Sequence, residues 1–91
     1  MNAPTPPTGH KYVNLSASGL VKTGQGVLFM VKVASSSSGT IKLWDNTAGS
    51  GTVIQNTMSV DAKEEHYFSV EFTTGLYITI GGTADITAYF I

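Results

Sequence analysis

The chain has 91 residues and a formal net charge of −1, and only 12% of its residues are charged, about half the usual share. A chain of this length forms one domain, and without arginine it lacks the basic surface expected of a nucleic-acid binder. There is no cysteine, which excludes disulfides and thiolate metal sites. The longest apolar run, residues 27–31, is too short to span a membrane, so we expect a soluble domain.

Serine, threonine and glycine dominate the polar part of the composition. Nine Ser, twelve Thr and ten Gly far outnumber the five Lys and six acidic residues. Such a composition favours strands and turns over helices. We therefore expect an all-β protein with no helix.

All three prolines, Pro4, Pro6 and Pro7, lie in the first ten residues, which show no apolar periodicity. Proline fixes φ and favours extended conformations in the residue before it. The pattern predicts an extended N-terminal arm over residues 1–10, followed by one β-domain over residues 11–91. Two interpretations of the arm stay open: a disordered terminus, or a segment that grips a neighbouring subunit.

Beyond the arm, short β-rich runs alternate with clusters of Gly, Ser, Asn and Asp. The expected strands are residues 11–17, 20–21, 27–33, 40–44 and 52–60, and the expected turns and loops are residues 22–26, 35–39, 45–51 and 61–66. The strand from Val27 to Val33 is apolar at both odd and even positions, which is typical of a central strand covered on both faces.

The last third of the chain, residues 67–91, predicts a three-stranded antiparallel meander. Three-residue loops at 73–75 and 81–83 would place apolar residues opposite one another on one face. The residues expected to face inward are Phe68, Val70, Phe72, Leu76, Ile78, Ile80, Ile86 and Phe90. Those expected to face outward are Ser69, Glu71, Tyr77, Thr79, Asp85, Thr87 and Tyr89. Together with the earlier strands, this predicts an antiparallel β-sandwich of about eight short strands, jelly-roll or immunoglobulin-like.

Candidate catalytic groups are few. His10 lies in the arm, and His66 ends an acidic turn that also contains Asp61, Glu64 and Glu65. Lys63 lies among these acids and their spacing matches no calcium loop, so we interpret the segment as a solvated turn. No serine has the surroundings of a nucleophile, and the Gly pairs lack the helix and Lys that a phosphate loop needs. We therefore expect no enzymatic activity, no metal and no cofactor.

Aromatic residues are the better candidates for function. Tyr67, Tyr77 and Tyr89 are expected to point away from the core, and Trp44 has the opposite parity to Leu43. These residues could be subunit-interface anchors, or they could stack on sugar rings with Asp45 and Asn46 as polar partners, or they could only cover one face of a sheet. Leu28 and Met30, on the second parity of the central strand, favour the interface interpretation.

Two stretches resemble a known class of proteins. They are Gly39-Thr40-Ile41-Lys42-Leu43-Trp44-Asp45-Asn46, followed by Gly49-Ser50-Gly51-Thr52, and the later run from Thr74 to Thr87, Thr-Gly-Leu-Tyr-Ile-Thr-Ile-Gly-Gly-Thr-Ala-Asp-Ile-Thr. Residues 11–91 are similar to small all-β structural proteins of tailed-bacteriophage virions, including head decoration (cement) proteins and fibre-associated modules.

The resemblance implies structural work on a virion. It implies a decoration protein on the capsid surface, without enzymatic activity, that forms a homotrimer and binds the major capsid protein or another virion protein, with no nucleic-acid or membrane partner. The residues expected at the subunit or capsid interface are Pro4, Pro6, Pro7, Leu28, Met30, Trp44, Tyr77 and Tyr89. The alternative is a carbohydrate-binding or fibre-type adhesion module.

Overall fold

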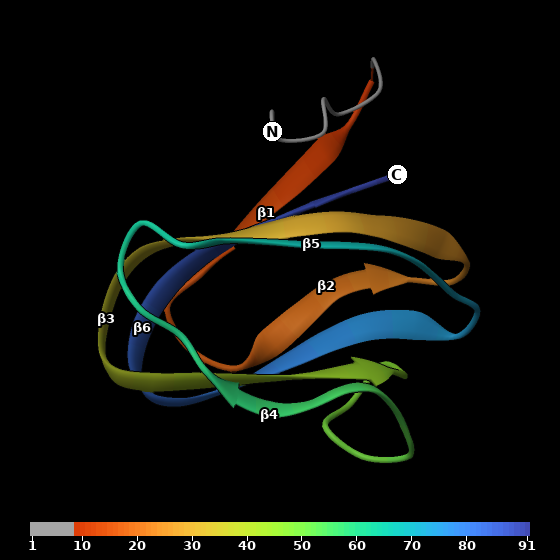
Figure 1. Cartoon of the computed structure of the whole chain (residues 1–91). Coiled ribbons are helices and arrows are strands. Elements are labelled where there is room, and N and C mark those ends of the chain that lie inside the picture. The colour runs from red at the N-terminus through yellow and green to blue at the C-terminus, as the bar shows by residue number, and fades with distance from the viewer. Residues whose placement is uncertain (1–8) are drawn as a thin grey trace.

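The computed structural model describes residues 9–91, where the only regular secondary structure is β-strand (Figure 1). The strands are β1 (Lys11–Leu15), β2 (Gly19–Thr23), β3 (Gly26–Asp45), β4 (Thr52–Ser59), β5 (Glu65–Phe72) and β6 (Gly75–Phe90). All of them belong to one antiparallel sheet. The all-β expectation is confirmed, with six strands in place of about eight.

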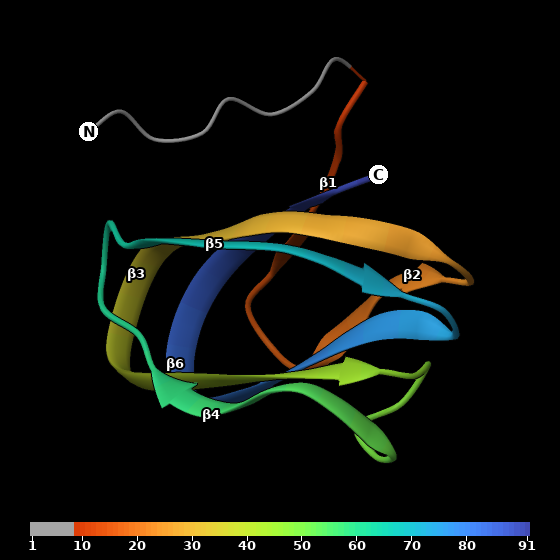
Figure 2. The ribbon, with the colours of Figure 1, turned by 45° about the vertical axis from the view of Figure 1, so that its right-hand side comes forward.

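Two long strands, β3 and β6, lie side by side at the centre of the sheet. They pair antiparallel along most of their length, from Leu28 opposite Phe90 to Trp44 opposite Tyr77. Both bend at the same place, and Figures 1 and 2 show the two ribbons turning back together at one side of the molecule. The sheet is thereby folded onto itself. One half consists of β1, β5 and the adjoining halves of β6 and β3, and the other half consists of β2, β4 and the remaining halves.

The bend explains why the predicted number of strands was wrong. The segments expected at 27–33 and 40–44 are the two arms of β3, and residues 35–39 form the bend between them rather than a turn that ends a strand. Ser36 stabilises this bend, because its Oγ accepts a hydrogen bond from Gly39 N at 3.1 Å and donates to Val60 O at 2.7 Å. In the same way, residues 81–83 lie inside β6.

The predicted meander is also wrong, although its two faces are assigned correctly. β5 pairs with β3 and not with β6, so the connection at residues 73–74 passes from one half of the folded sheet to the other. The predicted inward residues are nevertheless the inward ones: Phe72, Leu76, Ile78, Ile86 and Phe90 are buried, and Phe68, Val70 and Ile80 pack against the core. A three-residue loop and an uninterrupted strand preserve the same parity, so alternation cannot distinguish them.

The core lies between the two halves of the sheet and is entirely apolar among the described residues. Leu28 is a core residue with no exposed surface. The reason is a register shift between Leu28 and Met30, which interrupts the alternation of inward and outward side chains. Leu28 faces inward before the shift, and Val31 and Val33 face inward after it. Leu28 is therefore not available to the predicted interface, and this part of the prediction is corrected.

Candidate functional site

The two outer faces of the folded sheet carry the exposed apolar side chains. Among residues 9–91, five large apolar residues are exposed: Tyr12 at 65%, Ile91 at 48%, Leu20 at 41%, Val27 at 37% and Val53 at 36%. Each is next in sequence to a residue that lies in the core or packs against it. Successive side chains of a strand project to opposite faces. All five therefore lie on one or the other outer face. We call the outer face of the half that contains β1 and β5 the tyrosine face, and the outer face of the half that contains β2 and β4 the tryptophan face.

The tyrosine face is centred on a row of side chains that crosses four strands. In the ladder of backbone pairs, Tyr12 of β1 lies opposite Tyr89 of β6, Tyr89 opposite Met30 of β3, and Met30 opposite Tyr67 of β5. Paired residues project from the same side of a sheet, so these four side chains form one continuous row. Three strand spacings make the row about 14 Å long.

Phe29 and His10 extend this row. The Phe29 ring packs edge-on against Tyr67 with 5.6 Å between ring centroids, and the His10 ring lies 5.0 Å from the Phe29 ring. Phe29 and Met30 are each only 8% exposed, although they lie outside the core cluster. The centre of the face is thus covered by its own neighbours, and the exposed apolar surface lies at its margins.

One margin of the tyrosine face is formed by the last residue of the chain. Val27 and Ile91 exchange two backbone hydrogen bonds, of 3.0 and 2.9 Å. Both side chains alternate with core residues, Leu28 and Phe90, and so project outward. They add a second apolar pair beside the row.

The tryptophan face has a row of the same length on the other half of the sheet. Leu20 of β2 lies opposite Tyr77 of β6, Tyr77 opposite Trp44 of β3, and Trp44 opposite Val53 of β4. The pairing places hydrophobic residues from four strands side by side on one surface.

Trp44 is held in place by its neighbours. Its Nε1 donates a hydrogen bond to Thr79 Oγ1 at 3.0 Å, and Lys42 Nζ lies 4.5 Å from the centre of its ring. The loop after β3 also approaches this surface, because a Cβ at Gly49 would lie 3.3 Å from the Tyr77 ring. Trp44 and Tyr77 are therefore half-buried, and Leu20 and Val53 are the exposed ends of the row.

The two faces differ in charge. The tyrosine face carries three carboxylates, of Glu65, Glu71 and Asp85, and one ammonium group, of Lys32, which lies 3.8 Å from Glu65. The tryptophan face carries Lys42. Of the six acidic residues, all within the described part of the chain, none lies on the tryptophan face. One face is thus net negative and the other net positive.

The other three acidic residues, Asp45, Asp61 and Glu64, lie in or beside turns. The Asp45 side chain accepts hydrogen bonds from the backbone N–H groups of Thr73 and Thr74 at 2.9–3.1 Å, and a longer one from Gly75. Burial raises the pKa of Asp45, but these N–H donors together outweigh it, and the pKa lies below its ordinary value. Asp45 therefore closes the connection between β5 and β6 as an ionised group.

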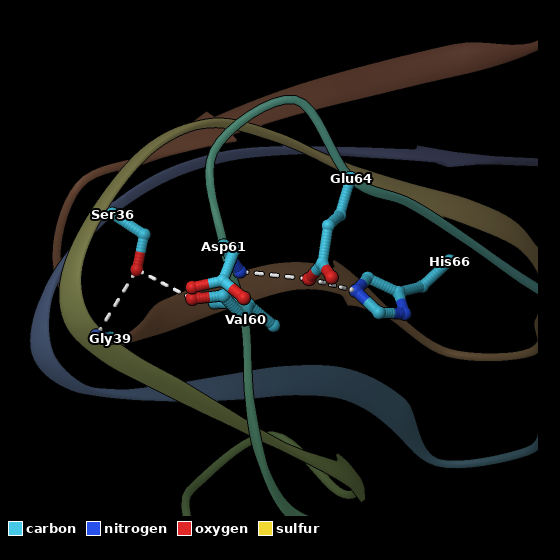
Figure 3. A network of polar contacts seen from close by, with 6 residues as sticks. All are labelled: Ser36, Gly39, Val60, Asp61, Glu64 and His66. Atoms are coloured by element: carbon cyan, nitrogen blue, oxygen red, sulfur yellow. Dashed lines mark hydrogen bonds and ion pairs between the residues drawn. The ribbon is translucent and has the colours of Figure 1, made fainter.

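The acidic turn before β5 is built in the same way (Figure 3). Glu64 Oε1 accepts a hydrogen bond from Asp61 N at 2.8 Å and lies 3.0 Å from His66 Nε2. The Asp61 N–H, followed by the His66 contact, lowers the pKa of Glu64. Together with the Ser36 contacts drawn in the same figure, this network connects the turn to the bend of β3.

A shallow hollow of about 270 Å³ lies between β1, β3 and β6. Its polar groups are paired within the chain: Thr87 Oγ1 donates to Asn14 Oδ1 at 2.6 Å, and Ser35 Oγ donates to Asp85 Oδ2 at 3.0 Å. Within residues 9–91 there is no cluster of side chains suited to a metal ion. The outer faces remain the strongest candidate site.

The structure separates the predicted interface residues into three groups. Met30 and Tyr89 lie on the tyrosine face, Trp44 and Tyr77 lie on the tryptophan face, and Leu28 lies in the core. Pro4, Pro6 and Pro7 lie outside the described residues. Tyr12, Leu20 and Val53 were missed as candidates, although their alternation with core-facing neighbours was the available signal.

The comparisons with known proteins found nothing: no family model, no curated protein and no solved structure matches the chain. In the part of the chain that the structure describes, no helix is long and apolar enough to cross a membrane.

Proposed function

We propose that the protein is an assembly module that acts through its two outer faces and has no enzymatic activity. The observation that carries this proposal is the pair of apolar cross-strand rows, three of whose four end residues are exposed: Tyr12, Leu20 and Val53. Contiguous apolar groups on rigid strands are typical of surfaces that bind other proteins. Aromatic and Met side chains, which form the middle of both rows, are enriched in such interfaces.

The resemblance described above makes this proposal specific. We propose a structural protein of a tailed-phage virion, of the decoration type, that attaches to the head shell and strengthens it. Its partners would be further copies of the same chain, arranged as a trimer, and the major capsid protein. In this proposal the folded sheet is a sandwich-like or jelly-roll-like member of that class.

Glycan binding is the competing function, and the geometry at Trp44 disfavours it. A sugar ring stacks on an open aromatic face, whereas Lys42 already lies over the Trp44 ring and the indole N–H is bonded to Thr79. Tyr77 is likewise approached by the loop at Gly49. Neither ring offers an unobstructed platform.

The test is co-sedimentation of the purified full chain with particles of the phage whose genome encodes it. We expect the wild-type chain to sediment with the particles. Tyr12→Asp or Leu20→Asp should reduce the bound fraction severalfold, because each places a charge in an apolar contact. Ala62→Asp is the matched control, since it adds the same charge in an exposed turn away from both rows. Failure to sediment, together with specific binding on a glycan array that Trp44→Ala abolishes, would overturn the proposal.

A further inference from the structure

We propose that the tyrosine face of one copy docks on the tryptophan face of the next copy, in a head-to-tail contact. The occupant of each face is thus a second copy of this chain. The inference rests on the proposed assembly function in taking the outer faces as contact surfaces. It adds which face meets which, and it does not depend on a virion partner.

The apolar parts of the two faces match in extent. Each row crosses four strands and is about 14 Å long, so the two rows can lie against each other along their whole length. The middle residues of both rows are partly or largely buried, whereas Tyr12 at one end of the tyrosine row and both ends of the tryptophan row are exposed. Tyr12 and Ile91 offer exposed apolar surface on one side, and Leu20 and Val53 offer it on the other.

Charge decides which faces meet. Two tyrosine faces in contact would bring six carboxylates together against two ammonium groups, and two tryptophan faces would oppose their Lys42 side chains. Like charges facing each other in an interface oppose association. A tyrosine face against a tryptophan face instead places Lys42 over a surface with a net negative charge. Lys32 and Glu65 already form an ion pair, so Glu71 and Asp85 supply the excess.

The folded sheet places the two faces on different sides of each copy (Figures 1 and 2). A head-to-tail contact uses one face of each partner and leaves the other face of each partner free. Such contacts either close into a ring or continue as an open stack, depending on the rotation between successive copies. Either product contains the same contact.

Complementation between two variants tests this contact. Tyr12→Asp disables the tyrosine face and Leu20→Asp disables the tryptophan face. Both side chains are exposed, so the fold should persist, which circular dichroism and thermal melting check. By light scattering at micromolar concentration, we expect the wild-type chain and Ala62→Asp to be oligomeric and each of the two variants alone to be monomeric. An equimolar mixture of the two should form dimers and nothing larger, because each partner contributes one intact face.

Two outcomes would overturn the inference. If Leu20→Asp alone still dimerises, the tyrosine face pairs with itself. If the wild-type chain stays monomeric, the faces bind a different protein, and sedimentation with particles would then support the proposed function while this contact fails.

Charge reversal provides a second test. Lys42→Glu should weaken assembly by about tenfold or more. Adding Glu71→Lys to the same chain should restore part of the loss, because the tyrosine face then carries two carboxylates and two ammonium groups and no longer repels the carboxylate introduced at position 42. Restoration supports the contact, and a further weakening in the double variant contradicts it. Glu71 lies on the outer side of β5, next to buried Phe72, so its substitution leaves the core intact.

Discussion

The two ends of the folded sheet are held together by different forces. At the bend, backbone segments of β3 and β6 approach so closely that side chains are excluded. A Cβ at Gly82 would lie 2.2 Å from Ser38 O, and one at Gly39 would lie 2.8 Å from the Ala84 Cβ. At the open end, where β5 connects to β6, the Asp45 carboxylate accepts hydrogen bonds from the backbone N–H groups of residues 73–75 at the partly exposed surface.

The comparison shows how a single sheet can enclose a core. The bend depends on the close approach of the backbones at Gly39 and Gly82 and on the hydrogen bonds of Ser36. None of these contacts involves a titrating group, so their contribution to stability should not change with pH. The contact at Asp45 depends on a charge, so protonation weakens it. The first arrangement determines that the sheet folds over at all, whereas the second only secures the connection between its two halves.

Gly82→Ala should be the most damaging change. Gly82 has a φ of +64°, and its added Cβ would overlap the Ser38 carbonyl, so we expect a loss of more than about 3 kcal/mol in the free energy of unfolding. Gly24→Ala is the matched control, because Gly24 has a φ of +87° but no atom within 4 Å of its Cβ position. There only the conformational cost of about 1–2 kcal/mol applies. Urea unfolding measures both, and equal losses would show that the close approach at the bend does not matter.

Ser36→Ala tests the polar contacts of the same bend. It removes the acceptor of Gly39 N and the donor to Val60 O in a half-buried site, which should cost about 2 kcal/mol. The loss should be the same at pH 7 and pH 3, because no titrating group is involved. Ser37→Ala, at an exposed neighbouring position, should change stability by less than about 0.5 kcal/mol. Similar losses of stability for the two variants would show that the hydrogen bonds of Ser36 do not stabilise the bend.

Asp45→Asn tests the charge at the open end. We expect a loss of about 1 kcal/mol at neutral pH, comparable to the loss of a helix-capping side chain. The pKa of Asp45 is lower in the folded protein than its ordinary value of 3.8, so its stabilisation is fully present above that value and disappears as the pH falls through the folded pKa. The difference between wild type and variant in urea unfolding should therefore shrink below about pH 4. A difference that stays constant down to pH 2 would contradict the role of the charge.

Glu64→Gln should have the smallest effect. Glu64 lies in the exposed turn that contacts the bend through Val60, and it makes two contacts there, to Asp61 N and His66. If the bend is held by packing, this variant should lower the melting temperature at pH 7 less than Asp45→Asn does. A larger drop than that of Asp45→Asn would show that the bent end, too, relies on charge.

Much of the local structure could be predicted from the amino-acid pattern. The strand expected at 52–60 is β4, the loop expected at 45–51 joins β3 to β4, and the inward and outward sides of residues 67–90 are as expected. Of the candidate site, the outward position of Tyr77 and Tyr89 followed from the same alternation. The outward position of Met30 did not, because Met30 shares its parity with buried Leu28 and only a register shift places the two on opposite sides. The rows could not be predicted, because a row joins residues from four strands and needs the pairing of all four.

For residues 67–90, alternation of apolar and polar residues determined, from the sequence alone, which side chains enter the core, because side chains project to opposite faces along a regular strand whatever its partner is. It failed at Leu28, where a register shift interrupts the alternation. Only the tertiary structure decided which strands pair. The segments on either side of Ser35–Gly39 and of Gly81–Thr83 could have been hairpins or the two arms of one bent strand, and both solutions keep the same parity. The choice depends on contacts between residues far apart in the chain, where β3 and β6 bend together and Gly39 and Gly82 leave room for the backbones to meet. Those contacts also separate the tyrosine face from the tryptophan face.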